Sequence, residues 1–270
     1  MAVEVTKADG TTEAFNPEKL VASLVRAGAE HGTARDITAQ IEHTLYRGVT
    51  TQEIYRHAFA RLREVRRGAA ARYSLKRALL EFGPSGFPFE AYMAELFRAE
   101  GFTAKIDQIM QGACVEHEVD VVLKKDGVTT CVEAKFHNAA GFKTDLKTVL
   151  YVKARIDDLG DCKGLVVTNT KFTSKAVEYA ACVGLELLSW EEPNGKTLQQ
   201  RIDAVGLYPI TALTTLSRRE KMALLSQKKV LCSDLTKDTQ ALAVAGLGGS
   251  KADRVLEEVG SLCVPVKHIE

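Results

Sequence analysis

Residues 118–137, EVDVVLKKDGVTTCVEAKFH, decide the fold of the central part of the chain. Two apolar runs flank the Asp-Gly dipeptide at 126–127, which is typical of a tight turn between antiparallel strands. Asp120 interrupts the first run, and Glu133 and Lys135 interrupt the second. The stretch therefore predicts a β-hairpin that carries charged side chains inside its strands.

The spacing of these charges places them close together. In a strand, side chains two residues apart share a face, so Glu133 and Lys135 point the same way. A turn at 126–127 makes Asp120 a rough cross-strand neighbour of Glu133. Paired carboxylates bind a hard cation such as Mg²⁺ or Mn²⁺, and a lysine beside the metal stabilises the charge that develops at a phosphate. The residues allow metal-assisted phosphodiester hydrolysis, but a solvent-facing hairpin with a salt bridge explains the same spacing.

The sequence around the hairpin predicts an α/β domain. Residues 86–195 read as helix, strand, strand, helix, strand, helix and strand, which indicates a mixed sheet with helices on its faces. The amphipathic stretch PFEAYMAELFRAEG at 88–101 contributes a third acid, Glu90, at its start. A Gly- and Pro-rich linker, GPSGFP at 83–88, separates this domain from the preceding segment.

The order FE…LF…GF…VDVV…VEAKF, followed by VVTNTKFTSKAVEYAACVGLELLSW at 166–190, resembles the Mrr-like restriction endonucleases of the PD-(D/E)XK nuclease superfamily. The resemblance implies that Asp120 and Glu133 are metal ligands, that Lys135 is the catalytic lysine, and that Glu90 assists the metal or its water. One departure is ACVEHEVD at 113–120, which replaces the glycine-rich approach to the aspartate. Glu118 could substitute for Glu90 or supplement it.

Residues 1–85 predict a β-hairpin followed by helices. Asn16 and Pro17 are typical of a helix start, and Thr50 or Thr51 with Glu53 is typical of a capping box. A polar set lies where the hairpin meets the first helix, and a helix N-terminus with nearby lysines suits a phosphate chain. Spacing alone favours the simpler interpretation, in which Asn16 only caps the helix and the lysines are solvated.

Four motifs in this segment resemble the ATP-cone, the nucleotide-binding module of ribonucleotide reductases and their repressors. They are V-x-K-x-DG at 5–10, FNPxKL at 15–20, G-x-TT-x-EIY at 48–55 and AARYSLKRALLEFG at 70–83. The resemblance implies regulatory binding of ATP or dATP by Lys7, Glu13, Asn16, Lys19 and Thr51. The position after Lys7, often basic in the family, is Ala8 here, which puts phosphate affinity and ATP/dATP discrimination in question. The basic run at 61–77 faces either DNA or solvent.

Residues 196–270 predict a smaller helical domain. Within it, ALAVAGLGGSKADRVLEEVG at 241–260 resembles a helix-hairpin-helix, in which the turn and the next helix N-terminus bind a DNA phosphate. The resemblance assigns this contact to Gly246, Gly248 and Lys251. A helix pair with a glycine turn is the alternative.

The composition fits these assignments. The chain has 270 residues, of which 46% are hydrophobic and 26% charged, and its net charge of +1 means that any nucleic-acid surface is local. Its cysteines are scattered without a CxxC pair, which indicates reduced thiols, and no apolar run reaches transmembrane length. We expect a cytoplasmic protein that does not engage membranes.

Together these patterns predict an α/β protein with an ATP-cone at 1–85, a restriction-endonuclease-like domain with a mixed sheet at 86–195 and a helical domain at 196–270. The predicted function is an Mg²⁺- or Mn²⁺-dependent DNA endonuclease regulated by ATP or dATP, with DNA and an adenine nucleotide as partners and a homo-oligomer as the expected assembly. The alternative is a non-catalytic, nucleotide-responsive DNA-binding regulator that keeps the nuclease scaffold. In a third hypothesis the ATP-cone supports assembly only.

Overall fold

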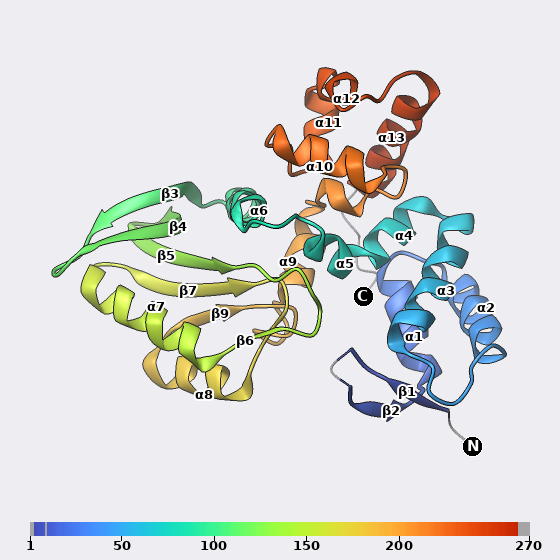
Figure 1. Ribbon diagram of the computed structural model, residues 1–270, viewed down its shortest axis with the longest axis horizontal. Helices are drawn as coiled ribbons and strands as arrows, with labels where there is room; N and C mark the ends of the chain where they lie inside the picture. Colours follow the sequence, from blue (N-terminus) through green and yellow to red (C-terminus); the bar gives the residue numbers. More distant parts are fainter. Residues whose placement is uncertain (1–2, 9, 264–270) are drawn as a thin grey trace.

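The computed structural model describes residues 3–8 and 10–263. A helical part near the N-terminus, a central part built on a sheet and a second helical part follow one another along the chain (Figure 1). The predicted α/β class, with a mixed central sheet between helical segments, is confirmed.

The N-terminal part is a hairpin followed by helices. Asn16 caps the first helix by accepting a hydrogen bond from the backbone N of Lys19 at 3.2 Å, and Thr50 caps the third in a capping box with Glu53. The helical stretch that ends this part is divided into two helices at Ser74. The elements are β1 (Glu4–Thr6), β2 (Thr12–Ala14), α1 (Pro17–Arg26), α2 (His31–Glu42), α3 (Thr51–Val65), α4 (Arg67–Tyr73) and α5 (Leu75–Leu80).

The central part contains a five-stranded sheet in the order β3-β4-β5-β7-β9, in which β3, β4 and β5 are antiparallel neighbours and β5, β7 and β9 are parallel. The β4–β5 turn is the predicted one, since Asp126 and Gly127 both have positive φ, as a type I′ turn requires. The elements are α6 (Phe87–Ala99), β3 (Thr103–Gln111), β4 (Glu116–Lys125), β5 (Val128–Lys135), β6 (Lys143–Thr144), α7 (Leu146–Leu159), β7 (Lys163–Thr168), β8 (Lys171–Phe172), α8 (Ser174–Val183) and β9 (Glu186–Leu188).

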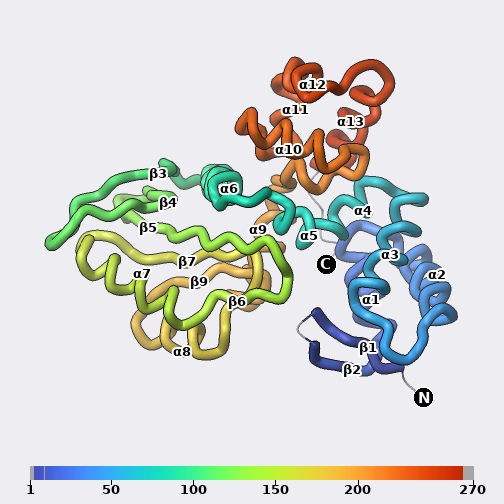
Figure 2. Tube along the Cα trace, viewed as in Figure 1, coloured from blue at the N-terminus to red at the C-terminus, as the bar shows by residue number. Residues whose placement is uncertain are grey.

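Strand β3 was absent from the predicted order, and the short parallel pair β6–β8 was absent as well. Residues of β3 alternate between polar and apolar, and most of them are exposed or only partly buried. Because β3 is an edge strand, it lacks the continuous apolar run that marked the buried strands. The Cα trace shows the β3–β4 ribbon projecting from one end of the sheet (Figure 2).

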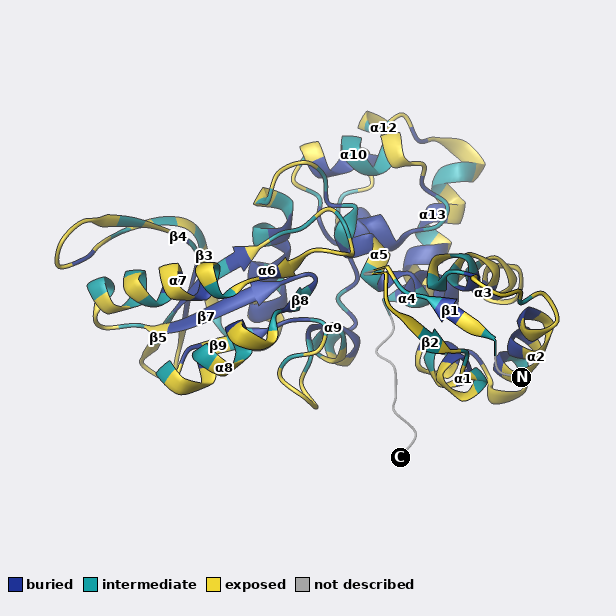
Figure 3. Cartoon of the chain, turned by 60° about the horizontal axis from the view of Figure 1, so that its bottom comes forward, coloured by how far each residue is buried: buried dark blue, intermediate teal, exposed yellow. Residues whose placement is uncertain are grey.

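Helices cover both faces of the sheet. Helix α6 packs on one face against Val121, Leu123, Val132 and Ala134, whereas α7 and α8 pack on the other face against Val166. Alternate residues of β4 and β5 therefore point to opposite layers. The central strands are buried, and the β3–β4 tip is exposed (Figure 3).

The C-terminal part consists of helices that share a core with α6, since one buried cluster includes residues from Ala71 to Leu262. Its elements are α9 (Leu198–Val205), the 3-10 turn η1 (Ile210–Ala212), α10 (Arg218–Ser226), α11 (Asp234–Lys237), α12 (Gln240–Val244) and α13 (Gly249–Leu262). No helix within the described residues is long and apolar enough to span a membrane.

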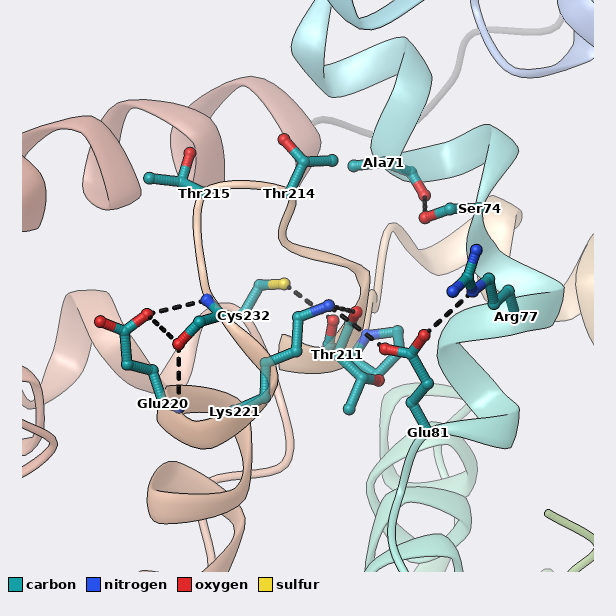
Figure 4. Close-up of polar contacts among 12 residues, drawn as sticks. Ala71, Ser74, Arg77, Glu81, Thr211, Thr214, Thr215, Glu220, Lys221 and Cys232 are labelled. Atoms are coloured by element: carbon teal, nitrogen blue, oxygen red, sulfur yellow. Dashed lines mark hydrogen bonds and ion pairs between the residues drawn. The ribbon is translucent and has the colours of Figure 1, made fainter. Parts of the chain in front are cut away.

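Polar contacts join the first and last parts of the chain. Arg72, which the basic run suggested for DNA or solvent, is 8% exposed and donates to the backbone oxygens of Ser261 and Leu262, both at 3.1 Å. Lys221 donates to Thr211 O at 2.6 Å and forms an ion pair with Glu81 at 3.4 Å (Figure 4). The last helices of the N-terminal part, α4 and α5, are thereby fixed to the C-terminal part.

Candidate active site

Strands β4 and β5 place the predicted catalytic residues on the sheet. Val121 pairs with Val132, and continuing this register by one residue puts Asp120 opposite Glu133. Both side chains lie on the face covered by α7, because Val122 and Cys131, two residues away on each strand, pack in a cluster with Ile156 of that helix. Lys135 is exposed at the end of β5, on the same face as Glu133.

Asp120 is held by the neighbouring strand. Its Oδ2 accepts a hydrogen bond from the backbone N of Ala134 at 2.7 Å. Burial, followed by the negative charge of Glu133, raises the pKa of Asp120 from 3.8 to about 6, although this hydrogen bond opposes the rise. The structure therefore brings the two carboxylates close enough for the charge of Glu133 to act on Asp120.

Glu133 has a counter-charge that sequence reasoning missed. Arg155 of α7 donates from Nη1 to Glu133 Oε2 at 2.6 Å, and the two side chains are only 10% and 15% exposed. Arg155 also donates to the Tyr151 hydroxyl and lies over its ring, 4.6 Å from the centroid. The one signal in the sequence was the position of Arg155 on the helix after the hairpin, which does not by itself show where the side chain points.

Glu90, in the first turn of α6, belongs to the same electrostatic group. Burial, and then the charge of Asp120, raises the pKa of Glu90 from 4.5 to about 7, with smaller effects from Asp107, Glu118 and Glu133. Glu118, the other acid that the sequence offered for the site, is exposed. Its charge raises the pKa of both Glu90 and Asp120. The acids therefore form a single negative cluster around Asp120.

Two more residues near the cluster were not predicted. Asp107 lies opposite Asp120 in the β3–β4 register and has a φ of 53°, which is uncommon for a residue other than glycine. His137, two residues after Lys135, contacts Thr144 Oγ1 through its ring at 3.1 Å, and burial and then the Lys135 charge lower its pKa. The exposed lysine thus has a half-buried imidazole as its neighbour.

The donor chemistry of the cluster fits a hard divalent cation, because its possible ligands are carboxylate oxygens and the charge of a cation would offset their mutual repulsion. Among residues 3–8 and 10–263, no three His, Cys, Asp or Glu side chains are already gathered as a metal site. Asp120 and Glu133 are the residues that would hold such a cation, and Arg155 supplies the present counter-charge of Glu133.

The residues predicted for nucleotide binding lie where β1, α1 and α3 meet. Glu13 Oε2 accepts from Lys7 Nζ at 2.8 Å and from Lys19 Nζ at 3.3 Å. These contacts, that of Lys7 first, lower the pKa of Glu13. Thr51 is the first residue of α3, which the Thr6 N to Val49 O hydrogen bond of 2.9 Å ties to β1.

The structure therefore gathers lysines and two helix N-termini at one exposed place. Asn16 contributes the cap of α1 there. Positive side chains and helix N-termini together suit a polyphosphate.

The predicted DNA-binding turn lies between α12 and α13. Gly246 has a φ of 77°, and Gly248 is the residue before the first turn of α13. Lys251 forms an ion pair with Glu220 of α10, with Nζ and Oε1 2.6 Å apart. Burial alone would raise the pKa of Glu220, but the contact with Lys251 and the hydrogen bonds from Ser217 lower it to about 2. A phosphate contact by Lys251 would have to compete with Glu220 and stays a prediction.

Comparison with known families matches each part of the chain. The ATP cone domain model matches residues 3–80, the restriction endonuclease model matches 84–194, and the model described as AF1548-like, C-terminal, matches 208–263. The predicted order of an ATP-cone followed by a restriction endonuclease domain is confirmed.

Individual relatives are similar to about two thirds of the chain. An uncharacterized protein of Archaeoglobus fulgidus is 37% identical over 170 residues, which cover 62% of this chain and 97% of that protein. The crystal structure of AF1548, a protein of unknown function, matches at 34% identity and a TM-score of 0.56, over 66% of this chain and 98% of that one. Can2 from Sulfobacillus thermosulfidooxidans, in complex with cyclic tetra-adenylate, matches 64% of this chain and 49% of its own at 13% identity, and its TM-score of 0.30 is too low for any inference.

Proposed function

Because the chain belongs to the family of the Archaeoglobus fulgidus protein and joins an ATP-cone to a restriction endonuclease domain, we propose that it is a divalent-metal-dependent DNA endonuclease controlled by ATP or dATP. The observation that carries the proposal is the acidic cluster of Asp120, Glu133 and Glu90 beside Lys135. A solvent-facing hairpin would not keep carboxylates half-buried with raised pKa values. Crowding of this kind is typical of catalytic sites.

The side chains divide the chemistry among them. Asp120 and Glu133 would hold the cation through their carboxylate oxygens, and bound Mg²⁺ or Mn²⁺ would supply Lewis acidity and a water of lowered pKa. Lys135 would set its ammonium against the negative charge that develops on the phosphate oxygens. Glu90, with a pKa of about 7, is partly protonated at neutral pH and would accept or return a proton at its carboxylate.

Arg155 would control the availability of Glu133. In the metal-free state its guanidinium neutralises Glu133 and lets two carboxylates coexist in a half-buried place. Its positive charge, on α7 beside the candidate site, would also suit a phosphate. We therefore assign Arg155 a positioning role.

Nucleotide control would reach the site by two contacts. Gly141, in the loop after Lys135, lies against the β1–β2 hairpin, since a Cβ built on it would be 3.6 Å from Ala8 O. Buried Asn169 accepts from His137 N at 2.9 Å and donates to His137 O at 2.7 Å and to Leu79 O of α5 at 3.1 Å. A nucleotide at Lys7 would therefore act on the loop that follows the catalytic strand.

The test is cleavage of supercoiled plasmid in Mg²⁺ or Mn²⁺, with and without ATP or dATP. We expect nicking that depends on the metal, a rate that changes with the nucleotide, and losses of about 100-fold or more in Asp120→Asn and Lys135→Ala. Glu178→Gln, at an exposed position of α8, should cleave like the wild type. Cleavage that persists in Asp120→Asn would show that the cluster is not the active site.

A second function has one observation in its favour. Arg155 already supplies a counter-charge to Glu133 from within the chain, as a non-catalytic DNA-binding regulator with a nuclease scaffold would require. For that function we expect nucleotide-dependent DNA binding without nicking in either metal. Isothermal titration of Mg²⁺ into the wild type and Asp120→Asn separates the two functions, because the regulator needs no metal at Asp120.

A further inference from the structure

A groove outside the acidic cluster lies between α6 and the segment from α10 to α11. Its volume is about 430 Å³. One side is a single face of α6, formed by Phe87, Ala91 and Arg98, and the other side includes Lys228, Lys229 and Lys237. The groove therefore joins the restriction endonuclease domain to the C-terminal part of the chain.

The groove adjoins the candidate active site. Ala91 directly follows Glu90 on α6, and Ile106, which also lines the groove, directly precedes Asp107 on β3. Since α6 rises about 1.5 Å per residue, its groove face extends about 12 Å from the level of Glu90 to Arg98. A chain that lies in the groove would therefore approach the acidic cluster from the side of Glu90 and Asp107.

Positive charge dominates the lining. Its acids are engaged with their own surroundings: Asp234 accepts from the backbone N of Val230 at 3.1 Å, and Glu95 pairs with Arg98. Lys229 has a partner in Asp238 at 2.8 Å, but no carboxylate within the described residues forms an ion pair with Lys228 or Lys237. The two lysines give the groove a net attraction for anions.

An aromatic ring lies among these cations. Phe87 is 39% exposed, and Lys228 Nζ lies 6.0 Å from its ring centroid. Exposed aromatic rings beside lysines are typical of surfaces that bind unpaired nucleic acid, because bases stack on the ring while phosphates meet the ammonium groups. The volume is that of a pocket for one small molecule, so it admits a nucleotide but not a duplex.

We propose that this groove binds an unpaired stretch of DNA next to the cleavage site, with a base on Phe87 and phosphates at Lys228 and Lys237. The proposal rests on the proposed endonuclease function and specifies its substrate as DNA with a single-stranded segment. Duplex alone would meet the lysines but leave the ring without a base.

The test is fluorescence anisotropy with a labelled oligo-dT strand and a blunt duplex of equal length, in EDTA so that no cleavage occurs. We expect tighter binding of the single strand and a loss of about tenfold in Phe87→Leu, which corresponds to one stacked base. Lys228→Gln and Lys237→Gln should each lower the slope of log affinity against log salt by about 0.7. Lys175→Gln, at an exposed lysine of α8, is the matched control and should keep the wild-type slope.

Circular dichroism and thermal unfolding of each variant show whether it is folded, and all substituted side chains are at least partly exposed. Equal affinity for single strand and duplex, or unchanged binding in folded Phe87→Leu and both lysine variants, would overturn the proposal. Binding to the groove without cleavage by the wild type, either of plasmid or of a duplex that carries a single-stranded segment in Mg²⁺ or Mn²⁺, would leave the groove assignment intact and refute the endonuclease. Cleavage by the wild type, together with unchanged DNA binding in the groove variants, would support the endonuclease and refute the groove assignment.

Discussion

Replacing Arg155 by methionine should destabilise the metal-free protein because it leaves Glu133 without a counter-charge. The guanidinium and carboxylate are 2.6 Å apart at their nearest atoms and 10% and 15% exposed. Two unit charges about 4 Å apart attract by about 4 kcal/mol at the effective dielectric of a partly buried site. The methionine variant no longer carries the desolvation cost of a buried guanidinium, which offsets part of this loss. We therefore expect the free energy of unfolding to fall by about 2–3 kcal/mol.

The assay is urea unfolding in EDTA at pH 7.5, carried out as a double-mutant cycle with Glu133→Gln. We expect a coupling energy of about 2 kcal/mol between the two positions. Arg61→Met removes the same group from an exposed pair with Glu64, and this control should change stability by less than about 1 kcal/mol.

Mg²⁺ supplies a second readout of the same contact. Because a cation would replace the missing guanidinium, saturating Mg²⁺ should raise the stability of Arg155→Met more than that of the wild type. A coupling energy below about 0.5 kcal/mol would refute the reasoning that Arg155 neutralises Glu133. An equal effect of Mg²⁺ on both proteins would refute its exchange for the metal.

Three further predictions concern the rest of the molecule. Because the pKa values of Glu90 and Asp120 are raised to about 7 and about 6, the folded protein without metal binds more protons than the unfolded chain between about pH 4 and 7. Its free energy of unfolding should therefore fall as pH rises through this window. Urea unfolding at pH 5 and pH 8 checks the sign, and the fall should be smaller in Glu90→Gln. Lys7→Ala should reduce the thermal stabilisation by ATP with little change in the nucleotide-free melting temperature, and an unchanged ATP shift would place the nucleotide elsewhere. Asn169→Ala removes the amide that donates to His137 O and Leu79 O, so the free energy of unfolding should fall by about 1–3 kcal/mol. The same variant should abolish the effect of ATP on plasmid cleavage. A cleavage rate that still responds to ATP would exclude Asn169 as a link between the nucleotide and the candidate active site.

Local sequence was sufficient for the elements that carry the candidate site. The Asp-Gly turn at 126–127 and the apolar runs on either side predicted the β4–β5 hairpin and, through it, the opposition of Asp120 and Glu133. Strand β3 was missed because its exposed, alternating residues carry little of the apolar signal that marks a buried strand. The caps at Asn16 and Thr50 were predictable because a cap contacts backbone only three residues away.

By itself, the sequence determined the pattern of helices and strands, the family resemblances and the strand positions of the charged residues, since all of these depend on neighbours along the chain. The tertiary structure decided that Arg155 neutralises Glu133, that burial and neighbouring acids raise the pKa of Glu90 to about 7, and that Arg72 binds α13 rather than solvent or DNA. The physical reason is that burial and charge depend on which distant segments the core brings together. Spacing along the chain carries little information about those contacts.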